Sequence, residues 1–190
     1  FLGFLGLTSS ILISTPCFLV ALLAYSAALL YNAILKKSGL PGNMIVSGVV
    51  TAPFIYGAVL SDGYVSPRLI TFILPVFLSN LGREIIKGIS DVEGDALRGV
   101  KSIARVRGSG CAAKLGAAFY ISAVALSPLP YLLNLVSPIY VPIVAAADLG
   151  FLYSAYSIVK DHGRENALRV KKHTLLWMLI ALIAFIAGSI

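Results

Sequence analysis

Residues 16–35 read PCFLVALLAYSAALLYNAIL, a run of 20 residues without a charged side chain. A helix of about 20 apolar residues crosses the hydrocarbon core of a bilayer, so this run predicts a transmembrane helix. The whole chain has the same character, because 58% of its 190 residues are hydrophobic, 12% are charged and the mean hydropathy is +0.93. Soluble domains carry about 25% charged residues. The composition therefore excludes an ordinary soluble domain and a disordered chain, and it indicates an integral membrane protein.

Uncharged runs and proline breaks divide the rest of the chain into further spans. The predicted spans are 16–35, one within 38–61, one from about 67 to beyond 82, two between 115 and about 160 that are separated by breaks at 127–130 and 137–138, and 173–190. Residues 1–13 are apolar but too short to cross, and we interpret them as the tail of another helix. We therefore predict an all-α, polytopic transmembrane helix bundle. It has about six complete spans and part of a seventh, in one domain over residues 1–190.

The basic residues give this bundle an orientation. Fourteen of the 15 Lys and Arg residues fall in loops on one side of the predicted membrane, and only Arg68 falls on the other. Loops rich in Lys and Arg stay in the cytoplasm, so we predict a multi-pass protein of the cell membrane with its active site toward the cytoplasm. The net charge of +7 then concerns topology and the lipid bilayer, and we expect no nucleic-acid partner.

A polar segment, NLGREIIKGISDVEGD at residues 80–95, interrupts the apolar pattern. On a helix that turns about 100° per residue, five of its polar side chains fall within an arc of about 80°. These residues are Asn80, Glu84, Lys87, Asp91 and Asp95. Polar groups at membrane depth normally face a water-filled cavity or a bundle interior, so this stripe predicts a polar cavity near one membrane surface.

Asp91 and Asp95 are four residues apart, a spacing at which like charges repel on a helix. A bound cation would explain the pair, and Mg²⁺ typically takes one or two carboxylates together with substrate phosphates. Arg98 and Lys101, followed by two more arginines, could hold phosphate oxygens. The pattern predicts a diphosphate bound through Mg²⁺. The alternative is a solvated loop beside the membrane whose charges are incidental.

Two groups of motifs carry a resemblance to a known family. The sequences REIIK at 83–87, DVEGD at 91–95 and GVKS at 99–102 resemble the second aspartate-rich motif of the UbiA superfamily of intramembrane prenyltransferases. Upstream, YNAILKKSGLPGN at 31–43 resembles the tyrosine–lysine loop of that family.

The resemblance implies a helical bundle around a central cavity, with Mg²⁺ as the cofactor. It places Asp91 and Asp95 as metal ligands and catalytic residues, and Tyr31 as a further catalytic residue. It makes Lys36 and Lys101 substrate-binding residues. With the residues of the polar stripe, the predicted substrate-binding set is Lys36, Asn80, Glu84, Lys87, Arg98 and Lys101.

The chain departs from the family pattern at two places. Gly88 stands where archaeal relatives often carry Asp. The first aspartate-rich motif, of the type NDxxDxxxD, is absent from these 190 residues. We expect this motif and further helices to lie upstream, and we expect the 190 residues alone to be inactive.

The resemblance implies Mg²⁺-dependent transfer of a prenyl group from a prenyl diphosphate to a membrane-associated acceptor. The favoured reaction moves a geranylgeranyl group to geranylgeranylglyceryl phosphate, in archaeal ether-lipid synthesis. An aromatic acceptor of the quinone or chlorophyll pathways is the alternative within the enzyme class. A transporter or lipid-binding protein without enzymatic activity is the alternative outside it. Asp148, an acid in an apolar run, is either functional or hydrogen-bonded to a neighbouring helix.

Overall fold

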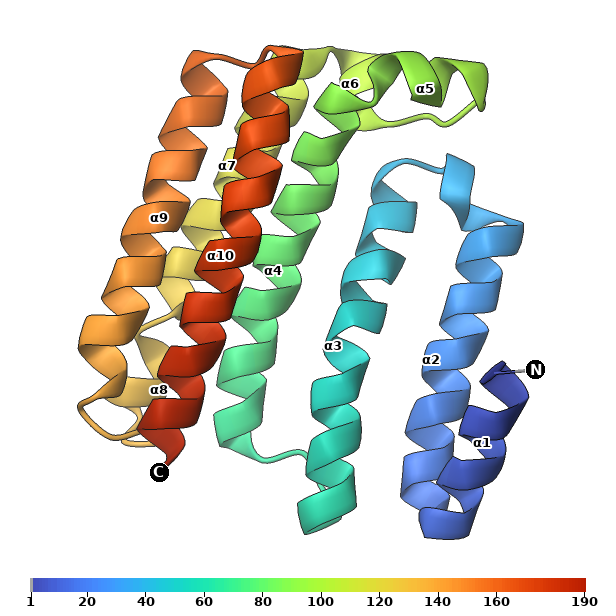
Figure 1. The fold of residues 1–190 in the computed structure, drawn as a ribbon, viewed down its shortest axis with the longest axis vertical. Coiled ribbons are helices and arrows are strands. Elements are labelled where there is room, and N and C mark those ends of the chain that lie inside the picture. Colours follow the sequence, from blue (N-terminus) through green and yellow to red (C-terminus); the bar gives the residue numbers. More distant parts are fainter. Residues whose placement is uncertain (1) are drawn as a thin grey trace.

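A computed structural model describes residues 2–190, and all regular structure in that range is helical (Figure 1). The elements are α1 (Leu2–Ile13), α2 (Thr15–Ala33), the 3-10 turn η1 (Leu35–Lys37), α3 (Leu40–Asp62), α4 (Pro67–Ser90), α5 (Val92–Leu97), α6 (Ile103–Arg107), α7 (Ser109–Leu126), α8 (Leu129–Leu132), α9 (Tyr140–Lys160) and α10 (Arg164–Ser189). Six helical segments are long and apolar enough to cross a membrane, and α1 is a shorter apolar helix. The predicted all-α bundle of about six spans is thereby confirmed.

Local sequence signals fix several helix ends. The Ser14 hydroxyl accepts a hydrogen bond from the Cys17 N–H at the start of α2, and Ser66 does the same for Leu69 at the start of α4. A proline follows each cap within the first turn, where its missing N–H costs nothing. Gly63 ends α3 in the left-handed region, at φ 77°.

Three boundaries differ from the sequence prediction. The last helix begins at Arg164 rather than near His173, and α7 begins at Ser109 rather than at Leu115. Both helices continue through charged residues, because a helix satisfies its own backbone in water as well as in lipid. The predicted continuous helix over 80–95 is also wrong, since α4 ends at Ser90 and α5 begins at Val92.

Four helices form the packed core. Helices α4, α7, α9 and α10 lie against one another, and their buried residues include Ile86, Tyr120, Phe151 and Ile158. Small residues allow α4 and α7 to approach closely: a Cβ added at Gly82 would meet the Gly116 carbonyl oxygen at 2.8 Å. Such approaches are typical of helix packing in membranes.

A second group of helices, α1 to α3, lies beside this core (Figure 1). Helix α3 packs on α4, α2 packs on α3, and α1 packs on α2. Only 6% of the α2 span and 11% of the α3 span is buried, against 39% of the α4 span. Most of this second group therefore presents apolar side chains outward.

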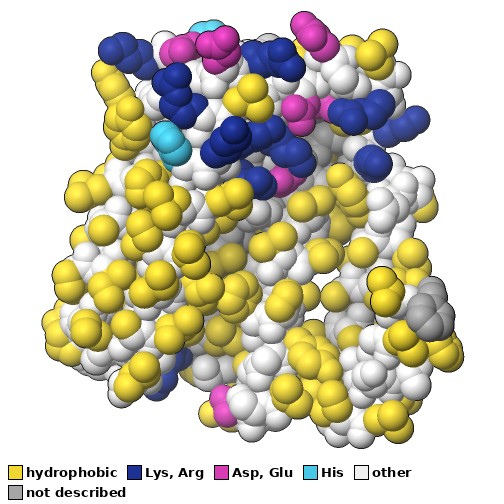
Figure 2. All heavy atoms as spheres, viewed as in Figure 1, with side chains coloured by type: hydrophobic (Ala, Val, Ile, Leu, Met, Phe, Trp, Pro, Cys, Tyr) yellow, Lys and Arg dark blue, Asp and Glu magenta, His cyan; other side chains and the backbone are white. Residues whose placement is uncertain are grey.

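Charged side chains gather at one end of the molecule. Figure 2 shows Lys and Arg side chains spread along the whole upper end of the molecule, the end at which α5 and α6 lie, above a broad hydrophobic band. Asp148 lies within α9, and the side chain of Ser127, at the end of α7, contacts it at 2.6 Å. The contact agrees with the interpretation of Asp148 as a hydrogen-bonding partner of a neighbouring helix.

Candidate active site

A polar cavity of about 200 Å³ lies at the charged end, between the ends of α2, α3 and α4 and the α5–α6 segment. Its polar lining residues are Tyr31, Lys36, Asn43, Glu84, Lys87, Asp91, Asp95, Arg98 and Ser102. Both helix groups of the fold therefore contribute side chains to the lining of this cavity. The cavity combines three carboxylates with three cationic side chains.

The two aspartates enter this cavity from a break in the helix. Asp91 has φ −109° and ψ 8°, and it ends α4 and begins α5 at once. The Asp95 N–H donates to the Asp91 carbonyl at 2.8 Å, so the two residues stay one turn apart across the break. Asp95 is buried and its Oδ1 lies 3.3 Å from the Arg98 guanidinium. Asp91 and Asp95 therefore keep the separation of one helical turn that the sequence predicted, although the helix is interrupted at Asp91.

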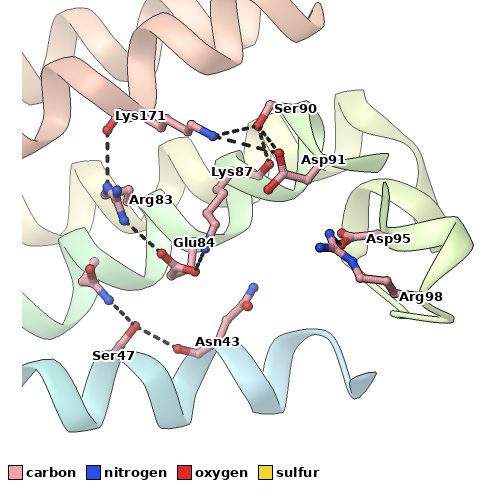
Figure 3. A network of polar contacts seen from close by, with 11 residues as sticks. Asn43, Ser47, Arg83, Glu84, Lys87, Ser90, Asp91, Asp95, Arg98 and Lys171 are labelled. Atoms are coloured by element: carbon pink, nitrogen blue, oxygen red, sulfur yellow. Dashed lines mark hydrogen bonds and ion pairs between the residues drawn. The ribbon is translucent and has the colours of Figure 1, made fainter. Parts of the chain in front are cut away.

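Glu84 is the centre of a small ionic network (Figure 3). Arg83 Nη1 lies 2.9 Å from one carboxylate oxygen, and Lys87 Nζ lies 3.0 Å from the other. The Glu84 side chain is only 11% exposed, whereas that of Lys87 is 43% exposed. These two cationic partners offset the free-energy cost of removing the Glu84 carboxylate from water. Glu84 thereby fixes Lys87, which can turn its free N–H donors to a ligand.

The tyrosine–lysine loop closes the other side of the cavity. The Lys101 N–H donates to the Lys37 carbonyl at 3.0 Å, which joins this loop to the segment after the aspartates. Gly39 lies at this junction with φ 73° and ψ −117°, and any Cβ there would overlap the Lys101 carbonyl oxygen. We call this junction of Lys37, Gly39 and Lys101 the clasp. Only glycine adopts this backbone conformation readily, so the clasp depends on residue 39 having no side chain.

Seven of the nine predicted site residues line the cavity: Tyr31, Lys36, Glu84, Lys87, Asp91, Asp95 and Arg98. Asn80 and Lys101 do not. The Asn80 amide is buried and donates to the Ser47 hydroxyl at 3.1 Å, so its polar group serves the contact between α3 and α4. Lys101 is exposed and contributes its backbone to the clasp. Their substrate-binding roles stay predictions.

Sequence reasoning missed other residues of this region. Asn43, which is outside the predicted site set, projects its amide from α3 toward Glu84 and Lys87 (Figure 3). The buried Ser102 hydroxyl, also at the cavity wall, has no hydrogen-bond partner in the described part of the chain. Its place directly after Lys101, in the GVKS motif, was the available signal.

The carboxylates suit a magnesium ion in part. Among residues 2–190, no group of three or more His, Cys, Asp or Glu side chains converges as a complete metal site. Asp91 and Asp95 nevertheless offer hard oxygen ligands on one cavity, beside cations that fit phosphate oxygens. Since Mg²⁺ usually completes its coordination with water and substrate phosphates, two protein carboxylates fit that chemistry.

Within residues 2–190, these features describe a helical membrane protein with six span-length helices and a cavity of mixed charge at one end. Residues 1–183 match the UbiA prenyltransferase family, and the chain belongs to this family. Members of the family generally use a divalent metal ion.

Similar proteins share one name. The chain is 38% identical over 162 residues to the digeranylgeranylglyceryl phosphate synthase of Archaeoglobus fulgidus, covering 84% of this chain and 55% of that protein. It is 32% identical over 189 residues to the synthase of Methanococcoides burtonii, covering 100% and 66%. A solved structure from work on digeranylgeranylglyceryl phosphate synthase in membranes matches with a TM-score of 0.86 and 32% identity, over 99% of this chain and 66% of that one. The chain thus spans between about half and two-thirds of the length of these proteins.

Proposed function

We propose that this chain forms part of an enzyme that transfers a prenyl group from a prenyl diphosphate to a membrane-associated acceptor, with Mg²⁺ as cofactor. The observation that carries the proposal is the cavity in which Asp91 and Asp95 lie beside Lys36, Lys87 and Arg98. A diphosphate with a bound cation needs this mixture of acidic and basic groups, whereas incidental surface charges have no reason to share a cavity.

Each charged group has a role in this reaction. Lys36, Lys87 and Arg98 donate hydrogen bonds to diphosphate oxygens and hold the leaving group at the membrane surface. Asp91 and Asp95 hold Mg²⁺, which when bound neutralises diphosphate charge and improves it as a leaving group. Tyr31 lines the α2 side of the cavity and limits access of water to the reacting carbon.

The bonds that change follow from the substrates. The bond between the terminal prenyl carbon and the diphosphate oxygen breaks, and the electron pair leaves with diphosphate. The oxygen of an acceptor hydroxyl forms the new bond to that carbon, and its proton passes to the released diphosphate.

We propose geranylgeranylglyceryl phosphate as the acceptor and geranylgeranyl diphosphate as the donor. The names of the relatives support this choice, as does the charge around the cavity. Lys37, Lys101 and Arg105 are exposed and lie close together, since Lys101 N–H donates to the Lys37 carbonyl and Arg105 to the Val100 carbonyl, and they suit an acceptor that carries a phosphate. The same basic end supports an orientation with the cavity toward the cytoplasm, in the cell membrane.

The test uses the full-length gene product in liposomes, because the upstream aspartate-rich segment stays a prediction. Geranylgeranyl diphosphate, geranylgeranylglyceryl phosphate and Mg²⁺ are supplied, and diphosphate release and lipid product are followed. We expect Asp91→Asn and Asp95→Asn each to lower transfer at least about 100-fold, equivalent to roughly 2.7 kcal/mol of barrier. Asp62→Asn, an exposed acid at the opposite end of α3, is the matched control and should leave transfer unchanged.

The outcomes separate the alternatives. Transfer to an aromatic acceptor instead would keep the reaction and overturn the acceptor. No transfer to any acceptor, together with no Mg²⁺-dependent binding of the diphosphate, would contradict the enzyme proposal and favour a transport or lipid-binding role.

A further inference from the structure

The first turns of helix α10 lie against the junction between α4 and α5. Its first residue, Arg164, donates from Nε to the Ser90 carbonyl at 3.3 Å. Two turns later, Lys171 donates from Nζ to the Ser90 hydroxyl at 3.3 Å and lies 4.0 Å from Asp91 Oδ1 (Figure 3). Arg164 and Lys171, both near the start of α10, therefore contact Ser90, the residue directly before Asp91.

The end of α4 explains why cations gather there. The last carbonyls of a helix have no partner within the helix, and together they carry a partial negative charge. Arg164 satisfies the Ser90 carbonyl, and the Ser90 hydroxyl donates to the Lys87 carbonyl at 2.8 Å. Arg164 of α10 thus caps the C-terminal end of α4 directly before Asp91.

The distances show how Lys171 acts on Asp91. Its direct separation from the carboxylate, 4.0 Å, is too long for a hydrogen bond. Ser90 bridges the gap, because its hydroxyl lies 3.3 Å from Lys171 Nζ and 3.0 Å from Asp91 Oδ1. The single proton of the Ser90 hydroxyl is shared between two acceptors, the Lys87 carbonyl at 2.8 Å and Asp91 Oδ1 at 3.0 Å. The Lys171 ammonium donates to the same oxygen and makes the hydroxyl a stronger donor toward both.

Lys171 is also tied to the opposite part of the network. Its backbone carbonyl accepts from Arg83 Nε at 3.3 Å, and Arg83 pairs with Glu84 in the cavity wall. The Lys171 side chain is 21% exposed, so it is held against the protein rather than extended to lipid head groups. The neighbouring Lys172 is exposed.

We propose that Lys171, acting through Ser90, is a positioning residue that orients the Asp91 carboxylate toward the cavity. The inference rests on the proposed function, in which Asp91 holds Mg²⁺ on the diphosphate. It assigns to α10 a part in the site that the sequence motifs gave only to residues 31–43 and 83–102. Partners that orient metal ligands typically contribute about 10- to 100-fold to metal affinity or activity.

The experiment compares Lys171→Met with Lys172→Met in the full-length protein. Two quantities are measured: prenyl transfer, and binding of Mn²⁺ by electron paramagnetic resonance in the presence of inorganic pyrophosphate. We expect Lys171→Met to lower transfer and to weaken Mn²⁺ binding by about 10- to 100-fold. Lys172→Met should stay within about twofold of the wild type in both, since its side chain is exposed.

Two further variants separate positioning from loss of structure. Lys171→Arg keeps a cation over Ser90 and should restore transfer to within about threefold of the wild type. Ser90→Ala should reproduce the loss of Lys171→Met, and the double variant should be no worse than either, because both act on one relay. A Lys171→Met protein whose melting temperature falls while its Mn²⁺ affinity stays normal would overturn the inference.

Whether Lys171→Met weakens or strengthens Mn²⁺ binding distinguishes positioning from a simple electrostatic effect. Removing a positive charge near a carboxylate strengthens cation binding if Lys171 is only an electrostatic neighbour, so tighter binding in Lys171→Met would overturn positioning. Equal behaviour of the Lys171 and Lys172 variants, in a wild type that transfers, would also overturn it and leave the proposed function intact. A wild type that neither transfers nor binds Mn²⁺ would overturn both.

Discussion

Helices α2 and α4 are both apolar spans, yet they belong to regions that are held together differently. In the α4 span 39% of the residues are buried, and α4 packs on α7, with a close approach at Gly82 and Gly116, and on α10. In the α2 span only 6% is buried. The core thus holds most of the buried residues, and of the second group α3 packs on it while α2 stays largely outside.

The two regions meet along the interface between α3 and α4, which includes several specific contacts. Phe54 on α3 meets Phe72 on α4 edge to face, with ring centroids 5.3 Å apart. Asn80 donates to Ser47 in the middle of the same seam, and the clasp closes its charged end. The candidate site lies on this seam: Glu84 and Asp91 come from α4 and its end, and Asp95 comes from α5. Tyr31 and Lys36 come from the second helix group.

The largest effect should come from breaking the clasp with Gly39→Ala. The new methyl group would overlap the Lys101 carbonyl oxygen, and the backbone would have to leave its glycine conformation. Displacing the tyrosine–lysine loop by about 1 Å should lower prenyl transfer about 100-fold. Transfer is measured in liposomes with the full-length protein.

Gly63→Ala is the matched control for this change. Gly63 also has a positive φ, 77°, but a Cβ there would meet no atom within 4 Å. Both variants strain the backbone, and only Gly39→Ala disturbs the junction between the regions. Equal losses in the two variants would show that strain alone is responsible and that the clasp has no role.

Packing within the core gives the second contrast. A Cβ at Gly150 of α9 would overlap the indole ring of Trp177, which is fixed by its hydrogen bond to Ser154 at 3.1 Å. Overpacking of this kind costs about 1–3 kcal/mol, so Gly150→Ala should unfold at lower denaturant concentration in mixed micelles.

The looser region should respond in the opposite direction. Gly48 lies in the middle of α3, and a Cβ there meets no atom within 4 Å. Gly48→Ala should therefore stabilise the protein by about 0.5–1 kcal/mol through helix propensity. If both alanine variants shifted the midpoint in the same direction, the two regions would not differ in packing as described.

The smallest expected effect concerns the seam itself. A double-mutant cycle of Ser47→Ala and Asn80→Ala measures the hydrogen bond between α3 and α4. Such bonds in membrane proteins contribute about 0.6 kcal/mol on average and up to about 1.7. We expect a coupling energy in that range from equilibrium unfolding. A value near zero would mean that the apolar contacts alone hold α3 in place.

Much of the fold could be predicted because the bilayer imposes simple rules. Uncharged runs located all six spans, and the prolines near residues 128 and 138 located the turn between α7 and α9. The i, i+4 spacing of Asp91 and Asp95 predicted that both would face one cavity. They do so because the Asp95 N–H still donates to the Asp91 carbonyl, which keeps the two residues one helical turn apart.

Hydropathy could not predict where helices continue into water. Residues 164–172 carry the charges of a loop, but they form the first turns of α10 and place Lys171 against Ser90. Nor does a single-helix projection identify the partner of a polar group. Asn80 shares the face of Glu84, yet at its depth the nearest acceptor is Ser47 on α3. Both features depend on contacts between helices that are distant in sequence.

The clasp also has a consequence for how the protein folds. Helical spans form locally, but the hydrogen bond between residues 37 and 101 closes a long loop and requires α3 to be docked on α4 first. The cavity is therefore assembled late. Since the region from α1 to α3 buries least, it is also the part that opens at the lowest free energy. Partial unfolding of α1 to α3 should therefore abolish the cavity while the core of α4, α7, α9 and α10 is still intact.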